Sequence, residues 1–445
     1  MSFLLEKFKS FSQKNALLFD GIAYTYEEFT NQIESYKKTL DKYSIKSKVV
    51  AILGDYSFYN LSLFFALFEN KNIIVPITTS VKKIQKEFIE ESFCEYIIKT
   101  NEKELLIENI EDKRSHKMID NLKDKNSSGL ILFSSGSTGK PKAMIHNLDN
   151  LINIYKDKKE KSINMLVFLM FDHIGGLNTV FNALSMGNCL IIPKQRDAKS
   201  ICELIEKYKI MLLPSSPTFL NLILISGEYE KYDLSSLRMI TYGTETMPQS
   251  LLLKLKAIFP KVKFLQTFGT SETGISTTTS KSSDSLFMKL EDINCEYKVV
   301  ENELWLRSST QVLGYLNASM DSFTSDGWFK TGDLVEVLQD GFLKIIGRNK
   351  EIINVGGQKV LPNEVESIIL SIPQIADCMV YGEQNAITGQ TVVCDVVLNE
   401  DIENIKKIIR LFCKDKLDSF KIPTKVNIVE KTNFSDRFKK IRRKD

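Results

Sequence analysis

Several features that would assign a protein class at once are scarce in this chain. It has only three histidines, and its seven cysteines lie far apart with no CxxC pair. That spacing is typical of reduced, buried thiols and makes a disulfide framework or a His/Cys metal site improbable. No apolar run is long enough to span a membrane, and the amphipathic N-terminus lacks the apolar core of a signal peptide. We therefore expect a cytoplasmic protein without a membrane span.

A strong excess of one charge is also missing. The 59 Lys and Arg against 56 Asp and Glu leave a formal charge of +3, which gives no reason to expect nucleic acid as a partner. Any recognition of anions must then be local. The length of 445 residues exceeds a usual domain about threefold, and 43% hydrophobic residues can fill sizeable cores, so more than one domain is expected.

Strand-like and helix-like segments alternate through most of the chain. An apolar run at Lys48–Gly54 is followed by a helical pattern at 59–70 and by another apolar run at Lys71–Ile77. The order recurs up to residue 269. Such alternation predicts βαβ units and largely parallel sheets, with ligand-binding loops at the carboxyl ends of the strands.

After about residue 300 the pattern changes. Short strand-like runs are joined by turns such as Ser325-Asp326-Gly327, which predicts a β-rich subdomain. The last 95 residues or so combine a helix begun by Pro362, two strand-like runs and an amphipathic helix, within the size of a small domain. The fold class that we expect is α/β, with a small α+β domain at the C-terminus.

The stretch "LFSSGSTGKPK" (Leu132–Lys142) is the strongest local candidate for an anion site. It is not a nucleotide P-loop, because Gly139-Lys140 is followed by Pro141 where that motif needs a hydroxyl residue. A Gly- and Ser-rich loop after a buried strand can nevertheless present backbone N–H groups, hydroxyls and lysines to phosphate. Composition alone leaves an ordinary mobile surface loop as an equal alternative.

Four further motifs follow that loop in the chain. They are "YGTETMP", "FGTSE", "TGDL" and "GRNKEIINVGGQKVLPNEVE". Taken in order, the five motifs resemble those of the adenylate-forming superfamily, which comprises acyl-CoA synthetases, nonribosomal-peptide adenylation domains and luciferases. The departures from the family pattern are Thr244 for a glycine, Phe268 for a tyrosine and Ser271 for a threonine.

The resemblance implies that ATP and Mg²⁺ activate a carboxylic acid as acyl-AMP, with release of pyrophosphate, before the acyl group passes to a pantetheine thiol. In that account Ser271 and Glu272 are catalytic residues, and Glu272 also holds magnesium. Asp333 binds the ribose hydroxyls, and Arg348 reaches the ribose and the phosphates. The complete set of residues that the resemblance assigns to the nucleotide is Ser134, Ser135, Gly136, Ser137, Thr138, Gly139, Lys140, Lys142, Gly243, Thr244, Glu245, Phe268, Gly269, Asp333 and Arg348.

The family also supplies a catalytic lysine near the chain end, in a Gly-Lys-(Ile/Leu)-x-Arg context. Here the tail reads "RFKKIRRKD", so the resemblance selects Lys440, with Lys439 in the glycine position and as the second candidate. Loss of that glycine matters because Gly adopts backbone angles that Lys adopts only at a cost. A solvated basic tail is the simpler explanation if the upstream motifs are set aside.

The resemblance further implies a small C-terminal domain that rotates between the two half-reactions. Lys350 occupies the hinge position, which divides the chain into an adenylation domain of residues 1–347 and a lid of residues 348–445. Gly356 and Gly357 would line the thiol tunnel, although a tight β-turn explains the pair equally simply.

The acid and the acceptor stay open at this stage. His173 and Gly176 correspond to the entrance of the acyl pocket, and Asp172 also resembles the aspartate that binds the ammonium group in amino-acid-activating domains. Coenzyme A and the phosphopantetheine of a separate carrier protein present the same thiol. A P-loop phosphotransferase and a nonenzymatic nucleotide-binding relative are the two rival classes, and the first leaves the later motifs unexplained.

Overall fold

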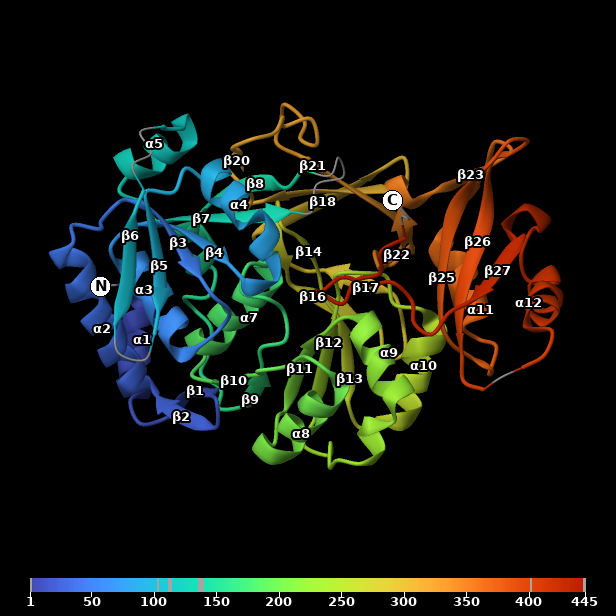
Figure 1. The fold of residues 1–445 in the computed structure, drawn as a ribbon, viewed down its shortest axis with the longest axis horizontal. Coiled ribbons are helices and arrows are strands. Elements are labelled where there is room, and N and C mark those ends of the chain that lie inside the picture. The colour runs from blue at the N-terminus through green and yellow to red at the C-terminus, as the bar shows by residue number, and fades with distance from the viewer. Residues whose placement is uncertain (1, 102–103, 111–113, 135–139, 401, 443–445) are drawn as a thin grey trace.

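The computed structural model describes the chain apart from residues 1, 102–103, 111–113, 135–139, 401 and 443–445. Its larger part contains two seven-stranded sheets (Figure 1). The first is parallel except for its edge strand, and its order is β13 (Lys263–Gln266), β12 (Met239–Tyr242), β11 (Leu212–Ser215), β9 (Asn164–Leu166), β10 (Cys189–Ile192), β1 (Asn15–Phe19) and β2 (Ile22–Thr25). The runs expected from the alternating pattern are therefore confirmed as strands of βαβ units.

The second seven-stranded sheet is mixed. Its central strands are parallel, and antiparallel strands lie at both edges. The order is β20 (Gly314–Tyr315), β8 (Lys142–Asn147), β7 (Gly129–Ser134), β4 (Ile73–Ile77), β3 (Val49–Leu53), β5 (Tyr96–Thr100) and β6 (Leu105–Asn109).

Two helices fill the space between these sheets. Helices α3 (Phe58–Glu69) and α7 (Ile174–Ser185) share one hydrophobic core with strands of both sheets. α3 is apolar on nearly all sides, which is the composition of a helix buried all round. The remaining helices of this part are α1 (Phe3–Phe11), α2 (Tyr26–Lys42), α4 (Gln85–Glu91), α5 (Lys117–Asp124), α6 (Leu148–Asn153), α8 (Ala198–Tyr208), α9 (Pro217–Ser226) and α10 (Gln249–Ile258), with short 3-10 turns η1 (Thr79–Ile84) and η2 (Glu228–Glu230).

A six-stranded antiparallel sheet confirms the expected β-rich subdomain. Its order is β16 (Thr278–Ser280), β17 (Met288–Leu290), β22 (Leu343–Arg348), β21 (Phe329–Val337), β19 (Glu303–Ser308) and β18 (Cys295–Val300). The hairpin of β14 (Phe268–Thr270) and β15 (Gly274–Ser276) precedes it in the chain. The short η3 turn (Asn349–Glu351) follows β22 and leads into the last part of the chain.

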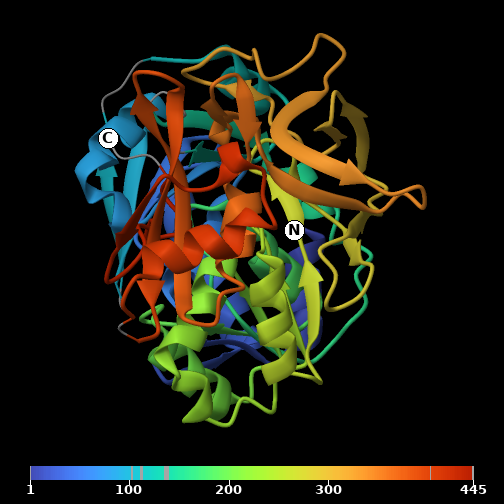
Figure 2. The ribbon, with the colours of Figure 1, turned by 90° about the vertical axis from the view of Figure 1, so that its right-hand side faces the viewer.

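The C-terminal unit, residues 353–428, has a hydrophobic core of its own. Figure 2 shows its sheet and helices lying in front of the rest of the molecule. The sheet joins β24 (Gln358–Val360), β23 (Ile353–Val355), β26 (Gly389–Leu398), β25 (Ile375–Asn385) and β27 (Lys425–Ile428), and the other elements are α11 (Pro362–Ile369), α12 (Ile405–Lys414) and η4 (Ser419–Lys421). These elements confirm the expected small α+β domain.

After β27 the tail, residues 429–442, leaves the C-terminal unit and runs back to the larger part (Figure 1). Among the described residues, no helix has both the length and the apolar composition that a bilayer crossing requires. All seven cysteines lie in the described part of the chain as buried thiols that form no disulfide, in agreement with their spacing.

Candidate active site

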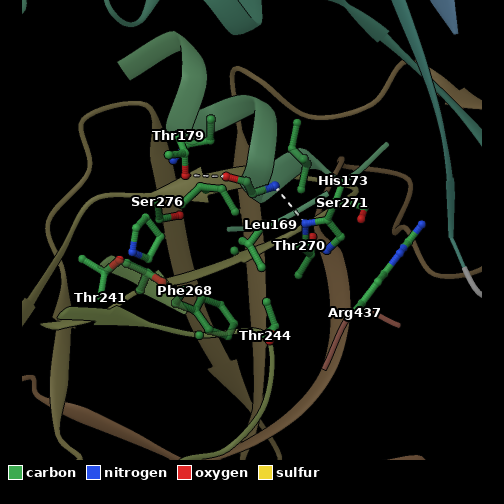
Figure 3. A pocket seen from close by; sticks show the side chains of 18 of the residues that line it. Leu169, His173, Thr179, Thr241, Thr244, Phe268, Thr270, Ser271, Ser276 and Arg437 are labelled. Atoms are coloured by element: carbon green, nitrogen blue, oxygen red, sulfur yellow. Dashed lines mark hydrogen bonds between the residues drawn. The ribbon is translucent and has the colours of Figure 1, made fainter. Parts of the chain in front are cut away.

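A cavity of about 1270 Å³ opens where the tail meets the larger part of the molecule. Its walls come from α7, from the ends of β11 and β12, from the β14–β15 hairpin and from tail residues 435–439. Figure 3 shows how Phe268, Thr244, His173 and Arg437 gather around it. The carboxyl ends of parallel strands meet here, which is the place where α/β sheets bind ligands.

The strands on either side of the predicted phosphate loop reach this cavity. Ser134 ends β7, Lys142 begins β8, and both residues line the wall. The ammonium of Lys142 lies 4.9 Å from the ring centroid of Tyr315. Lys140 is exposed. The loop residues predicted to hold phosphate lie outside the described residues, namely Ser135, Gly136, Ser137, Thr138 and Gly139.

Glu272 is held at the same wall by a tyrosine that the sequence did not single out. The Tyr315 hydroxyl donates a hydrogen bond to Glu272 Oε1 at 3.0 Å. Burial and the neighbouring Glu272 carboxylate raise the pKa of Tyr315, so its hydroxyl stays a donor. Ser271 lines the cavity next to Glu272. A carboxylate fixed at the same cavity wall as Ser134 and Lys142 fits the oxygen ligands that Mg²⁺ prefers.

The loop after β12 contains a strained residue. A Cβ at Gly243 would lie 2.6 Å from Thr267 Oγ1, so this position accepts only glycine. Thr244 has a φ of 71°, a left-handed angle that β-branched residues rarely adopt. Its hydroxyl is buried and has no partner among the described residues. Such strain and an unpaired hydroxyl are typical of functional sites.

Phe268 and Gly269 bring β14 to the wall of the cavity. A Cβ at Gly269 would lie 2.4 Å from the carbonyl oxygen of Gly274, so the close approach of β14 and β15 requires glycine here.

Glu245 behaves differently from the rest of its loop. Its carboxylate accepts hydrogen bonds from the backbone N–H of Thr218 at 2.7 Å and of Lys440 at 3.2 Å. The side chain thus holds the start of α9 and the tail together, and Glu245 is not one of the residues that line the cavity. Its contact with the nucleotide stays a prediction.

Asp333 and Arg348, both predicted to bind the nucleotide, form an ion pair. They lie opposite one another on β21 and β22, and Arg348 Nε is 2.7 Å from Asp333 Oδ1. Burial raises the pKa of Asp333, and the Arg348 guanidinium opposes that shift. Arg348, Thr331 and Gly332 line the cavity, whereas the Asp333 side chain is only 4% exposed and lies behind them.

The two candidate lysines of the tail lie in different surroundings. Lys440 Nζ pairs with Asp377 Oδ1 at 3.1 Å and donates to the Cys378 carbonyl, and its side chain is 9% exposed. It therefore points into the C-terminal unit and away from the cavity. Lys439 lines the cavity instead. Of the two consecutive lysines, Lys439 therefore faces the cavity and Lys440 faces the C-terminal unit.

Phe438 adopts a backbone angle that suits glycine. Its φ is 51°, in the left-handed region, and its ring packs 5.3 Å from the ring of Phe168 and 5.0 Å from that of Phe219. Ser216 Oγ also donates to its carbonyl at 2.8 Å. With Phe438 as the glycine equivalent, Lys439 is the motif lysine and Arg442 the motif arginine, a register one residue away from the one expected.

Burial and nearby cations lower the pKa values of two residues of the cavity, Lys439 and His173. Burial, and then the neighbouring Arg348, lowers the pKa of Lys439 to about 8. Burial, and then the cations of Arg437 and Lys439, lowers the pKa of His173 to about 3. His173 Nδ1 accepts from the backbone N–H of Gly175 at 3.1 Å, so the proton of this neutral imidazole lies on Nε2.

Asp172 lies next to the cavity wall and is paired within the protein. It is not one of the residues that line the cavity, whereas the adjacent His173 is. Asp172 Oδ2 is 3.1 Å from Arg437 Nη2 and accepts from Thr78 Oγ1 at 3.2 Å. Gly176 is not one of the lining residues either. It packs against the backbone, since a Cβ there would be 2.3 Å from the Met170 carbonyl oxygen.

The predicted hinge and thiol-tunnel residues are separated in this structure. Lys350 lies in η3 and lines the cavity. Gly356 and Gly357, with φ values of 57° and 86°, form the turn between β23 and β24 and are not part of the cavity wall. The structure thus brings the hinge lysine, but not the glycine pair, to the site.

The cavity continues along one face of α7. Residues spaced by three or four positions line it over two helical turns, and strands β9, β11 and β12 form the opposite wall. The helix residues are Ile174, Gly175, Asn178, Thr179 and Asn182. Lys158 and Lys161, from the exposed lysine-rich segment after α6, border the far end.

Comparison with known proteins agrees with this geometry. Residues 4–316 match the family model of the AMP-binding enzyme, and residues 364–435 match that of the AMP-binding enzyme C-terminal domain. The chain belongs to the AMP-binding enzyme family. This membership confirms the resemblance that the five motifs suggested.

Individual members of the AMP-binding enzyme family are distant from the chain. A 4-coumarate–CoA ligase-like protein of Oryza sativa subsp. japonica is 29% identical over 59% of this chain, and the match spans about half of that relative, 52%. A 2-succinylbenzoate–CoA ligase of Listeria monocytogenes is 24% identical over 94% of this chain and 93% of its own. The o-succinylbenzoate CoA synthetase of Bacillus subtilis, solved with an acyl-adenylate, has the same fold, with a TM-score of 0.78, 20% identity and coverage of 99% and 96%.

Proposed function

We propose that this protein activates a carboxylic acid with ATP as an acyl-adenylate, with release of pyrophosphate, and then transfers the acyl group to the thiol of coenzyme A. One observation carries the proposal: Lys439 on the tail reaches the same cavity as Glu272, Thr244 and the ends of the phosphate loop. Acid adenylation requires that the acid and ATP are aligned and that the negative charge of the phosphates is neutralised. A family member with these groups around one cavity can meet both requirements.

The proposed reaction has two steps. An oxygen of the acid attacks the α-phosphorus of ATP, and the bond to the β-phosphate oxygen breaks to release pyrophosphate. The thiol sulfur then attacks the acyl carbonyl, its proton leaves to solvent, and AMP departs with the electron pair of the C–O bond. Both steps develop negative charge on oxygen, which preorganised cations and N–H donors stabilise.

Residues of this chain supply those groups. The Lys439 ammonium can lie between the carboxylate and the α-phosphate, and neutral His173 can donate from Nε2 at the acid side. Bound Mg²⁺ would supply charge neutralisation on the leaving phosphates, with Glu272 as its protein ligand. Arg348, held by Asp333, faces the nucleotide side, and the Thr244 hydroxyl is a candidate contact for the adenine.

We further propose that the acid lies along α7 and is not an amino acid. Asp172 is not one of the residues that line the cavity, and its Oδ2 is paired with Arg437, which disfavours an amino-acid substrate. The lined face of α7 from Ile174 to Asn182 is about 12 Å long at 1.5 Å rise per residue. Polar side chains on this face, Asn178, Thr179 and Asn182, favour an acid that carries polar groups along its length.

The acceptor is coenzyme A in this proposal, since the curated relatives named above are CoA ligases. A carrier protein with a phosphopantetheine arm is the alternative, because both present the same thiol. We also place the two functional domains at residues 1–347 and 348–445, with Lys350 as the hinge. Lys350 lies in the short η3 turn between the antiparallel sheet and the C-terminal unit, which supports that division.

Mass spectrometry tests the proposal directly. Purified protein is incubated with ATP, Mg²⁺ and pooled hydroxylated, aryl, fatty and amino acids, with and without coenzyme A. We expect one acid to give an acyl-adenylate that becomes a coenzyme A thioester. An adenylate that persists with coenzyme A would favour a carrier protein, and one formed only from an amino acid would overturn the substrate class.

A further inference from the structure

An ion pair between a half-buried arginine and a buried aspartate joins the tail to the larger part of the molecule. Arg437 Nη2, two residues before Lys439, is 3.1 Å from Asp172 Oδ2, and the side chain of Asp172 is 4% exposed. The two residues lie 265 positions apart in the chain. The pair therefore exists only while the tail is inserted in the cavity.

Asp172 depends on Arg437 for charge compensation. Thr78 Oγ1 donates to Oδ2 at 3.2 Å, but Asp172 Oδ1 is buried and has no hydrogen-bond partner among the described residues. Arg196 also interacts electrostatically with Asp172, and its Nε donates to the Phe168 carbonyl at 2.7 Å. Withdrawal of Arg437 would leave a buried carboxylate without a paired cation, which is strongly unfavourable.

The pair is also well placed to position Lys439. Phe438 N donates to Ser435 O at 2.8 Å and Ser435 N to Lys439 O at 2.9 Å, so Arg437 and Lys439 belong to one tight turn. An anchor on Arg437 therefore restrains the backbone from which the Lys439 side chain enters the cavity. Phe438 supplies an apolar anchor in the same turn, but apolar contacts do not leave an unpaired charge when they are broken.

We propose that Asp172 and Arg437 form a latch that holds the tail inserted for acyl-adenylate formation and that is released for transfer to the thiol. This assignment rests on the proposed function, because it divides the two half-reactions. Asp172 and Arg437 are positioning residues: they act through Lys439 and through the population of the inserted tail. A pair that contributes to only one of two arrangements shifts the balance between them.

The test measures each half-reaction separately. Asp172→Asn and Arg437→Gln each remove the pair with little change in shape. In both variants we expect adenylate formation to fall about tenfold, because fewer molecules have the tail inserted. Thioester formation from preformed acyl-AMP and coenzyme A should stay within about twofold of wild type or rise, because this step uses the withdrawn tail.

Two controls sharpen the result. Lys431→Gln removes one exposed positive charge from the same tail outside the cavity, and it should leave both half-reactions unchanged. Arg437→Lys keeps a cation in reach of Asp172 and should recover at least about half of the adenylation rate. Loss of adenylation in Arg437→Gln but not in Asp172→Asn would contradict the latch, since Arg437 would then act on the substrates directly.

Hydrogen exchange provides a readout that needs no catalysis. The amides of residues 435–441 should exchange faster in Asp172→Asn and Arg437→Gln than in wild type and Lys431→Gln, because the inserted turn opens more often. Equal exchange in all four proteins would overturn the proposal. Wild-type protein that forms no adenylate from any acid would refute the proposed function instead, while the exchange comparison would still decide whether the latch exists.

Discussion

Single residues determine which of two adjacent lysines can act on the substrates. Lys439 faces the cavity, and Lys440 is paired with Asp377 inside the C-terminal unit. We predict that Lys439→Ala lowers adenylate formation by at least about a hundredfold, as the loss of a charge-stabilising group does, and spares transfer from preformed acyl-AMP.

The matched variant is Lys440→Ala. It leaves Asp377 buried without its cation, so it should lower the free energy of unfolding and reduce adenylation less than Lys439→Ala does. Pyrophosphate release and thermal unfolding measure the two effects. A larger loss of adenylation in Lys440→Ala than in Lys439→Ala, in folded protein, would restore the register predicted from the sequence.

The lowered pKa of Lys439 predicts a pH dependence. Burial and the cations of Arg348 and Lys350 lower it, Glu245 and Glu351 raise it, and the resulting pKa is about 8. The ammonium is present below that pH and lost above it, so kcat/KM for ATP in adenylation should fall as pH rises through about 8. In Lys439→Arg the fall should move to much higher pH, because a guanidinium stays protonated. If kcat/KM fell at the same pH in both proteins, the fall would reflect the titration of another group.

Thr244 predicts a change in stability. Its left-handed backbone suits glycine, so Thr244→Gly should raise the free energy of unfolding by about 1 kcal/mol, measured by urea denaturation. The neighbouring Gly243→Ala should lower it, because the new methyl group would meet Thr267. If Thr244→Gly stabilises the protein but weakens ATP binding, the Thr244 hydroxyl contributes to ATP binding at a cost in stability. A destabilised Thr244→Gly would contradict the account of strain.

At the level of elements, α7 is the wall along which the acid is proposed to lie. Asn182 is at the far end of the lined face. Asn182→Phe should fill the distal part of the cavity and lower kcat/KM about tenfold for acids that extend beyond the second helical turn. Acids the size of benzoate should stay within about twofold of wild type, which provides an internal control. An equal loss for short and long acids would show that the acid takes another path.

The sequence predicted the elements well and the side-chain directions poorly. Runs such as Lys71–Ile77 gave correct strands because apolar period and length are local properties. The sequence selected Lys440 because Ile441 matched a letter of the motif, and it could not show that Lys439 lines the cavity or that Phe438 has a positive φ, because both are properties of the folded tail. Tyr315 was missed because its contact with Glu272 spans 43 residues and leaves no local pattern.

At the scale of the whole molecule, the tail connects two units that each have their own core. Arg442 binds the tail to the C-terminal unit, where its Nη2 lies 2.8 Å from Glu366 Oε2. Phe438 and Arg437 bind the tail to the wall of the cavity. The fold class and the order of the domains could be predicted because five motifs occur in sequence order. The pairing of Asp172 could not be predicted, because its partner Arg437 lies 265 positions away, in the tail.

The measurement that tests the central claim most directly is detection of acyl-adenylate by mass spectrometry for wild type and Lys439→Ala, with ATP, Mg²⁺ and the acid pool. The account predicts an adenylate with wild type, its loss in Lys439→Ala, and thioester formation by both proteins from the same adenylate supplied preformed. An adenylate formed equally by the two proteins would contradict the assignment of Lys439 as the group that joins acid and nucleotide.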